Sequence, residues 1–161
     1  MFERFTERSR RALFDSRHSA FLAGFSVIEG HRLLYALIAS EDLLVLSLLR
    51  HAQVSADRVL SAMPSVPSAP AAPQRRSAFT RLERFLGIQR RVHNPEIPFD
   101  DELKRVLKFA EEEADGMHHA KIWTGHLLLG LLREELSAGR GPLMQSGMSI
   151  EAVRIAVRES I

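Results

Sequence analysis

The chain has 161 residues, of which 45% are hydrophobic and 26% charged, and its net charge is +2 with a pI near 9.5. This is an ordinary globular composition, and the small positive excess does not require a nucleic acid or an anionic membrane as partner. Because there is no cysteine, the sequence excludes disulfides, thiolate metal ligands and a cysteine nucleophile. The start, MFERFTERSRRALF, has no apolar signal core and the leucine runs are too short to cross a bilayer, so we expect a soluble, cytoplasmic protein without a membrane partner.

The first 62 residues predict four helices. The segment TERSRRALFDSRHSAFLA at 6–23 has helical spacing and breaks at Gly24, and further helices are expected near 30–39, 42–51 and 55–62. The stretch PSVPSAPAAP at 64–73 has four prolines in ten residues and therefore predicts an extended linker.

A basic segment at 75–91 follows the prolines. Its apolar residues could form one stripe of a short helix, framed by six arginines: Phe79, Leu82, Phe85 and Leu86 with Arg75, Arg76, Arg81, Arg84, Arg90 and Arg91. The favoured interpretation is a connector helix with a solvated basic face. The alternative is a basic amphipathic element that binds nucleic acid, an anionic surface or another partner, which would make the protein a regulator.

The last third predicts four more helices. Asp100 or Asp101 can cap a helix over 101–116, and Thr124 is the expected N-cap of a helix through Leu136. After the glycine-rich SAGRGP, Pro142 suits the first turn of a short helix that Gly147 closes, and Ser149 caps the last one.

The two sets of helices look like copies of one unit. Aligning Phe5 with Phe99 places Ala20 on Ala114, one added residue then brings His31 onto His126, and further slippage brings Arg58 onto Arg154. The sequence therefore predicts an all-α protein of two pseudo-symmetric four-helix repeats in one compact domain, with repeat 1 at 1–62, a linker with a short basic helix at 63–98, and repeat 2 at 99–161.

Motifs for catalysis are not found. GRGPLMQSG lacks the lysine of a P-loop, and GFSVI has Ile28 where a nucleophile elbow needs its closing glycine. The carboxylates Glu111, Glu112, Glu113 and Asp115 are interpreted as solvated surface, and the histidines lack metal-ligand spacing. His31 and His126 are expected to bond backbone at a helix start. We expect no enzyme, no catalytic residue, no metal and no cofactor.

The segments MFERFTERSRRAL and TGHLLLGLLRE closely resemble the Clp repeat, the paired four-helix unit of the N-terminal domain of ClpC- and ClpA-type unfoldases. The family's segment is Gly-Thr-Glu-His followed by Ile-Leu-Leu-Gly-Leu; WTGHLLLGLLREE matches it well and IEGHRLLYALIAS matches it poorly, but in the right place. The resemblance implies a non-enzymatic recognition module that receives adaptors and client proteins for a Clp-type ATPase. We expect a divergent stand-alone member; the alternative is that the chain is a fragment and the module is the recognition domain of a full unfoldase.

In some members each repeat also binds phosphorylated arginine, through the Glu of this segment and a Thr at the start of the first helix. The resemblance thus implies one candidate pocket in repeat 1, from Arg4, Thr6, Glu29 and Gly30, and one in repeat 2, from Asp100, Thr124 and Gly125. The match is partial, because Gly30 and Gly125 replace the Glu residues and Asp100 replaces the Thr.

An apolar surface between the repeats is therefore the expected binding site for a protein or peptide. The apolar run LLVLSLL at 43–49 is expected to be mostly core, although it could also contribute a hydrophobic groove or a homodimer face.

Overall fold

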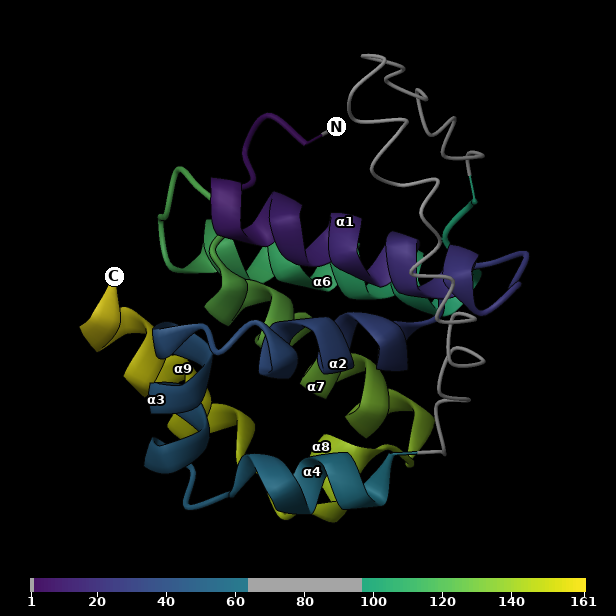
Figure 1. Ribbon diagram of the computed structural model, residues 1–161. Helices are drawn as coiled ribbons and strands as arrows, with labels where there is room; N and C mark the ends of the chain where they lie inside the picture. The colour runs from purple at the N-terminus through teal and green to yellow at the C-terminus, as the bar shows by residue number, and fades with distance from the viewer. Residues whose placement is uncertain (1, 64–96) are drawn as a thin grey trace, which may run out of the picture.

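The computed structural model describes residues 2–63 and 97–161, which form helices and no strands (Figure 1). The first group of helices is α1 (Glu7–Leu22), α2 (Gly30–Ala39), α3 (Leu43–His51) and α4 (Ala56–Ala62); the second is α6 (Asp101–Gly116), α7 (Thr124–Ala138), α8 (Pro142–Gln145) and α9 (Ile150–Ser160). The all-α prediction is confirmed. Among the described helices, none is both long and apolar enough to cross a membrane.

The predicted linker and the basic segment at 75–91 lie outside the described residues. The boundaries at 62/63 and 98/99 therefore stay a prediction, and so do both interpretations of the basic segment.

Polar residues cap most of the helices, and the predicted caps Asp100 and Ser149 are confirmed. The side chains of Thr6, Asp42, Ser55, Asp100 and Ser149 each accept a hydrogen bond from a backbone N–H of the first turn that follows. Such caps satisfy donors that have no partner inside the helix. The prediction for Thr124 is wrong: Trp123 occupies the N-cap position and Thr124 is the first helical residue. There the Trp123 N–H donates instead to Nδ1 of His126, at 3.0 Å.

The two groups of helices follow each other at a constant spacing of 94 residues. Three of the four helices in each group begin at N-cap positions 94 residues apart: Thr6 with Asp100, Glu29 with Trp123 and Ser55 with Ser149. Two pairs of left-handed residues have the same spacing, Gly24 with His118 and Gln53 with Gly147. The added residues in the sequence alignment are therefore wrong. The counterpart of His126 is Arg32, not His31, and the counterpart of Arg154 is Leu60, not Arg58.

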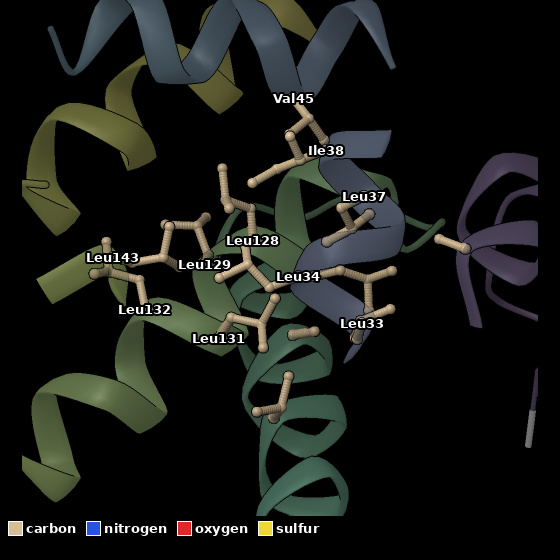
Figure 2. Close-up of a cluster of buried hydrophobic side chains, with 14 of the residues drawn as sticks. Leu33, Leu34, Leu37, Ile38, Val45, Leu128, Leu129, Leu131, Leu132 and Leu143 are labelled. Atoms are coloured by element: carbon tan, nitrogen blue, oxygen red, sulfur yellow. The ribbon is translucent and has the colours of Figure 1, made fainter. Parts of the chain in front are cut away.

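The core lies where α2 and α7 meet in the middle of the molecule (Figure 2). Their leucines interdigitate with side chains from α3 and α8, and all of these are buried: Leu33, Leu34, Leu37, Ile38, Val45, Leu128, Leu129, Leu131, Leu132 and Leu143. In Figure 1, α1 and α6 lie on one side of this pair and α4 and α8 on the other. Because the apolar faces of the two repeats cover each other, neither repeat has a closed core of its own.

The LLVLSLL run is mostly core, as predicted, and Leu44 and Leu46 are partly buried and pack against the core. Val45, Leu48 and Leu49 are buried, whereas Leu43 is 72% exposed. Helix α3 packs against α7 and α9 of the second repeat, so this run joins the repeats and does not line an apolar groove. Leu43 instead borders a mostly polar pocket of about 430 Å³ between α1 and the α2–α3 turn.

Candidate functional site

Short backbone segments that precede helices in one repeat pair with equivalent segments of the other repeat. Each bridge residue lies two positions before a helix: Phe5, before α1, bridges to Ile122, before α7, and Phe99, before α6, bridges to Ile28, before α2. Four hydrogen bonds of 2.8 to 3.1 Å hold these pairs: Ile122 N–H to Arg4 O, Thr6 N–H to Ile122 O, Ile28 N–H to Pro98 O, and Asp100 N–H to Ile28 O. With the 94-residue spacing, the two pairs are related by the pseudo-symmetry.

This exchange regroups the residues of the two predicted pockets. Arg4 and Thr6 lie at the first junction, which we define as residues 4–6 with 122–125, together with Thr124 and Gly125 of the other repeat. Asp100 lies at the second junction, residues 28–31 with 98–100, together with Glu29 and Gly30. Each junction thus takes residues from both repeats, and a ligand-binding role for these residues stays a prediction.

At the first junction, the polar groups of Arg4 and Thr6 have internal partners. The Arg4 guanidinium bonds Glu111, at 3.2 Å, and Asp115 on α6, and it also reaches the Ala120 carbonyl oxygen at 3.5 Å. The Thr6 hydroxyl caps α1 and shares a 2.8 Å hydrogen bond with Ser9. Both residues thus serve the fold.

At the first junction, the surroundings of Gly125 are apolar and leave little room for a carboxylate side chain at this position. A Cβ at this position would meet three apolar side chains: Val157 at 3.1 Å, Leu48 at 3.2 Å and Leu44 at 3.4 Å. Thr124 beside it is buried. In the resemblance a Glu stands here, and in this chain the same place is an apolar contact between α3, α7 and α9. Phosphoarginine recognition by the family's arrangement is therefore not supported at this junction.

The second junction is acidic. Gly30 is buried, and a Cβ on it would lie 3.0 Å from Oε1 of Glu102. Burial, with the nearby Glu29 charge, raises the pKa of Asp100, and burial likewise raises the pKa of Glu102. By the constant spacing, the counterpart of Gly125 here is His31, whose Nε2 lies 3.5 Å from Glu29. Phosphate would meet carboxylates at this junction and be repelled.

Histidines meet at the first junction without forming a metal site. Nδ1 of His119 and Nε2 of His126 are 3.0 Å apart, and burial followed by the His119 charge lowers the pKa of His126 to about 4. Since Nδ1 of His126 accepts the Trp123 N–H, its Nε2 carries the proton and donates to His119. The predicted backbone bond is confirmed for His126. No group of three possible metal ligands occurs in residues 2–63 and 97–161.

One carboxylate of the acidic run on α6 is not solvated, contrary to the prediction from the sequence. Glu113 is buried, not solvated, and its carboxylate accepts hydrogen bonds from Arg133 and, through two nitrogens, from Arg154. Burial acts to raise the pKa of Glu113, but these bonds outweigh burial and the pKa is lowered. This pairing makes the carboxylate structural.

An open apolar pocket lies between the repeats, along one face of α1. We call it the α1 groove; it has a volume of about 170 Å³ and is lined by Phe2, Arg10, Leu13, Phe14, Arg17 and Phe99. Phe14 is 58% exposed, and Phe2 makes edge contacts with Phe5 and Phe99, at centroid distances of 5.3 and 6.2 Å. Exposed aromatic side chains around a hollow are typical of sites that bind proteins or peptides.

We expected an apolar surface between the repeats, but these residues were not among those predicted to form it. The spacing of Arg10, Leu13, Phe14 and Arg17 along α1 places them on one helical face. That spacing was the available signal. The contribution of Phe99 depends on its long-range pairing with Ile28.

The chain is similar to known proteins over most of its length. Residues 4–144 match the Clp repeat N-terminal domain. An uncharacterized protein of Mycobacterium tuberculosis is 30% identical over 147 residues, which is 91% of this chain and 49% of that protein. A ClpA homolog of Guillardia theta, an ATP-binding subunit of an ATP-dependent Clp protease, is 30% identical over 98% of this chain and 17% of its own length.

A solved structure shows the same architecture. The N-terminal domain of the Clp-associated chaperone ClpD from Arabidopsis thaliana has a TM-score of 0.59 and 25% identity, covering 97% of this chain and 93% of that one. The chain spans about half the length, or less, of the curated relatives named above. Together with the crossed double repeat, the match over residues 4–144 shows that the chain belongs to the Clp repeat family.

Proposed function

We propose that this protein is a non-enzymatic recognition module that binds adaptor or client proteins for a Clp-type ATPase, and that the α1 groove is where it binds them. The observation that carries the proposal is the groove itself, an apolar hollow whose lining includes a phenylalanine that is 58% exposed. The Guillardia theta relative is an ATP-binding subunit of a Clp protease, which supports a partner of that class.

The junctions favour the groove over the two pockets first predicted. At the first junction Arg4 is bonded to α6 and Gly125 is walled by apolar side chains; at the second, Asp100 and Glu102 give a negative environment. The groove by contrast offers exposed apolar surface, whose burial stabilises a complex by roughly 25 cal/mol per Å² before the costs of association.

The test measures binding of the purified chain to a fluorescently labelled unfolded client and, separately, to the Clp-type ATPase of the same cell. Phe14→Ser is expected to weaken client binding about tenfold, because it removes the most exposed aromatic surface of the groove. Tyr35→Ser is the matched control, since Tyr35 is 44% exposed but does not line the groove. If neither client nor ATPase binds, or if both variants bind as wild type does, the proposal is wrong.

A further inference from the structure

Resting on the proposed function, we propose that the α1 groove selects protein segments in which an apolar side chain is flanked by acidic residues. The groove is bordered by two charged side chains, Arg10 and Arg17, and both are cationic. Its remaining walls are apolar. The preferred ligand is therefore defined by charge as well as by an apolar anchor.

The two arginines lie at either end of the apolar face of α1. Leu13 and Phe14 are three and four residues after Arg10, and Arg17 completes two helical turns. Two turns correspond to a rise of roughly 10.5 Å along the helix axis. An apolar anchor seated on Phe14 would thus lie between the two guanidinium groups.

Both arginines are available to a ligand within the part of the chain that the structure describes. Arg8 and Arg11, on the same helix, approach Asp42 at 3.9 Å and Asp15 at 4.0 Å. For Arg10 and Arg17 no carboxylate lies within ion-pair distance among residues 2–63 and 97–161. The Arg17 guanidinium instead lies over the Phe99 ring, 5.5 Å from its centroid, which holds it against the apolar wall.

This placement strengthens an ion pair with a ligand. Guanidinium groups are weakly hydrated, planar and suited to carboxylates, and a bound apolar side chain displaces water from beside them. An extended segment advances roughly 3.3 Å per residue, so two acidic residues about three positions apart match the distance between the arginines. Lysine or arginine at the same positions would be repelled.

The experiment compares three peptides of equal length with one central phenylalanine, flanked by glutamate, by glutamine or by lysine, in fluorescence anisotropy titrations of the full chain. The glutamate peptide is expected to bind about five- to tenfold more tightly than the glutamine peptide, and the lysine peptide most weakly. Raising the salt concentration should reduce the first difference.

Variants assign the effect to the groove. The double variant Arg10→Gln with Arg17→Gln should lower glutamate-peptide affinity to that of the glutamine peptide, which itself should bind unchanged. The control is Arg8→Gln with Arg11→Gln, which removes the same charge from the same helix outside the groove. Thermal unfolding verifies that both variants are folded.

Two failures can be told apart. If the three peptides bind equally, or if the control variant loses as much affinity as the groove variant, the charge selection is wrong while the recognition function stands. If no peptide binds and Phe14→Ser leaves client binding unchanged, the proposed function is wrong as well.

Discussion

The two repeats place different polar residues at the same buried helix position and satisfy them differently. At the second helix of each, the third helical residue is buried: Arg32 in α2 and His126 in α7. His126 bonds His119 and the Trp123 N–H. The counterpart of His119 is Phe25, and Arg32 places its guanidinium over that ring, 4.0 Å from the centroid. The same guanidinium has a hydrogen bond to Ser19 at 3.3 Å and an ion pair with Glu29 at 3.9 Å.

This difference shows that the conserved element of the duplication is backbone geometry. Repeat 2 satisfies the buried ring of His126 with two hydrogen bonds, whereas Nε and Nη2 of Arg32 have no hydrogen-bond partner in residues 2–63 and 97–161. Burial accordingly lowers the pKa of Arg32. Repeat 1 thus carries an energetic cost that repeat 2 avoids.

A second difference between the repeats lies in the lengths of their second and third helices. Helix α7 has 15 residues and α2 has 10, while α8 has four and α3 has nine. As a result Glu135 lies inside α7, buried, and accepts the Met144 N–H at the start of α8, at 2.9 Å. Its counterpart Glu41 ends α2 in the left-handed conformation, with φ of 50°, and is exposed.

The largest expected effect comes from the position where the first two helices of repeat 2 touch. A Cβ on Gly130 of α7 would overlap the carbonyl oxygen of Val106 and lie 3.0 Å from the Ala110 amide nitrogen on α6, whereas repeat 1 has Ala36 at this position. Gly130→Ala should therefore lower the free energy of unfolding by about 3 kcal/mol, because backbone atoms must move apart. Urea unfolding measures this.

The control is Gly116→Ala, where a Cβ would meet nothing within 4 Å; it should be neutral or slightly stabilising. Equal effects of the two variants would mean that α6 and α7 do not approach as closely as described.

The next effect is a pH dependence that arises from Glu135 in repeat 2. Burial raises the pKa of Glu135 to about 7, against about 4.3 in an unfolded chain. The folded state then holds its proton more tightly, so wild type should lose roughly 2–3 kcal/mol of stability through this group as pH rises from about 4.5 to 7. Glu135→Gln keeps an acceptor for Met144 and should remove this loss.

His126 acts in the opposite direction over nearly the same range. Its lowered pKa, about 4, makes stability fall as pH drops from about 6.5 towards 4. Without Glu135, the variant should therefore gain stability as pH rises. Urea unfolding at a series of pH values measures both slopes, and Glu41→Gln is the matched control; a variant slope equal to that of wild type would contradict the assignment.

A smaller effect on stability is expected when the buried Arg32 of repeat 1 is replaced by an apolar residue. Arg32→Met keeps a long side chain over Phe25 and removes a charge that is 1% exposed. We expect a gain of about 1 kcal/mol in unfolding free energy, measured by thermal or urea unfolding. In repeat 2, His126→Met should instead destabilise, since it leaves the Trp123 N–H without its acceptor. A loss for Arg32→Met would show that Arg32 is better paired than its contacts indicate.

The smallest effect distinguishes capping from binding at Thr6 and Asp100. Both side chains cap the first helix of their repeat, so Thr6→Ala and Asp100→Ala should each cost about 1 kcal/mol. Asp100→Thr, which copies repeat 1 into repeat 2, should restore the stability lost in Asp100→Ala. Peptide binding should be unchanged in all three variants. A loss of peptide binding without a loss of stability would mean that Thr6 and Asp100 bind the ligand directly.

Much of the fold could be predicted because helix ends are local. Thr6, Ser55, Asp100 and Ser149 mark starts through a side-chain bond to a backbone N–H two or three residues away, which sequence patterns capture. The repeat alignment was less secure, since it was anchored on the identical letters of His31 and His126. The register is instead set by backbone pairing, where Arg32 takes the place of His126.

The candidate site was harder to predict, since its members come from distant segments. Arg4 and Thr6 were correctly singled out as lying near a helix start, but the exchange of pairs across more than one hundred residues could not be read from either repeat alone. Phe99 reaches the α1 groove for the same reason.

By itself, the sequence determined the helices, the duplication and the choice of apolar residues, because spacing, caps and composition act over a few turns. Tertiary structure alone decided which repeat completes each junction, why Gly125 meets an apolar wall, and where an open groove remains between Phe14 and Phe99. These depend on two apolar faces that must cover each other, and that packing brings together residues which no local pattern connects.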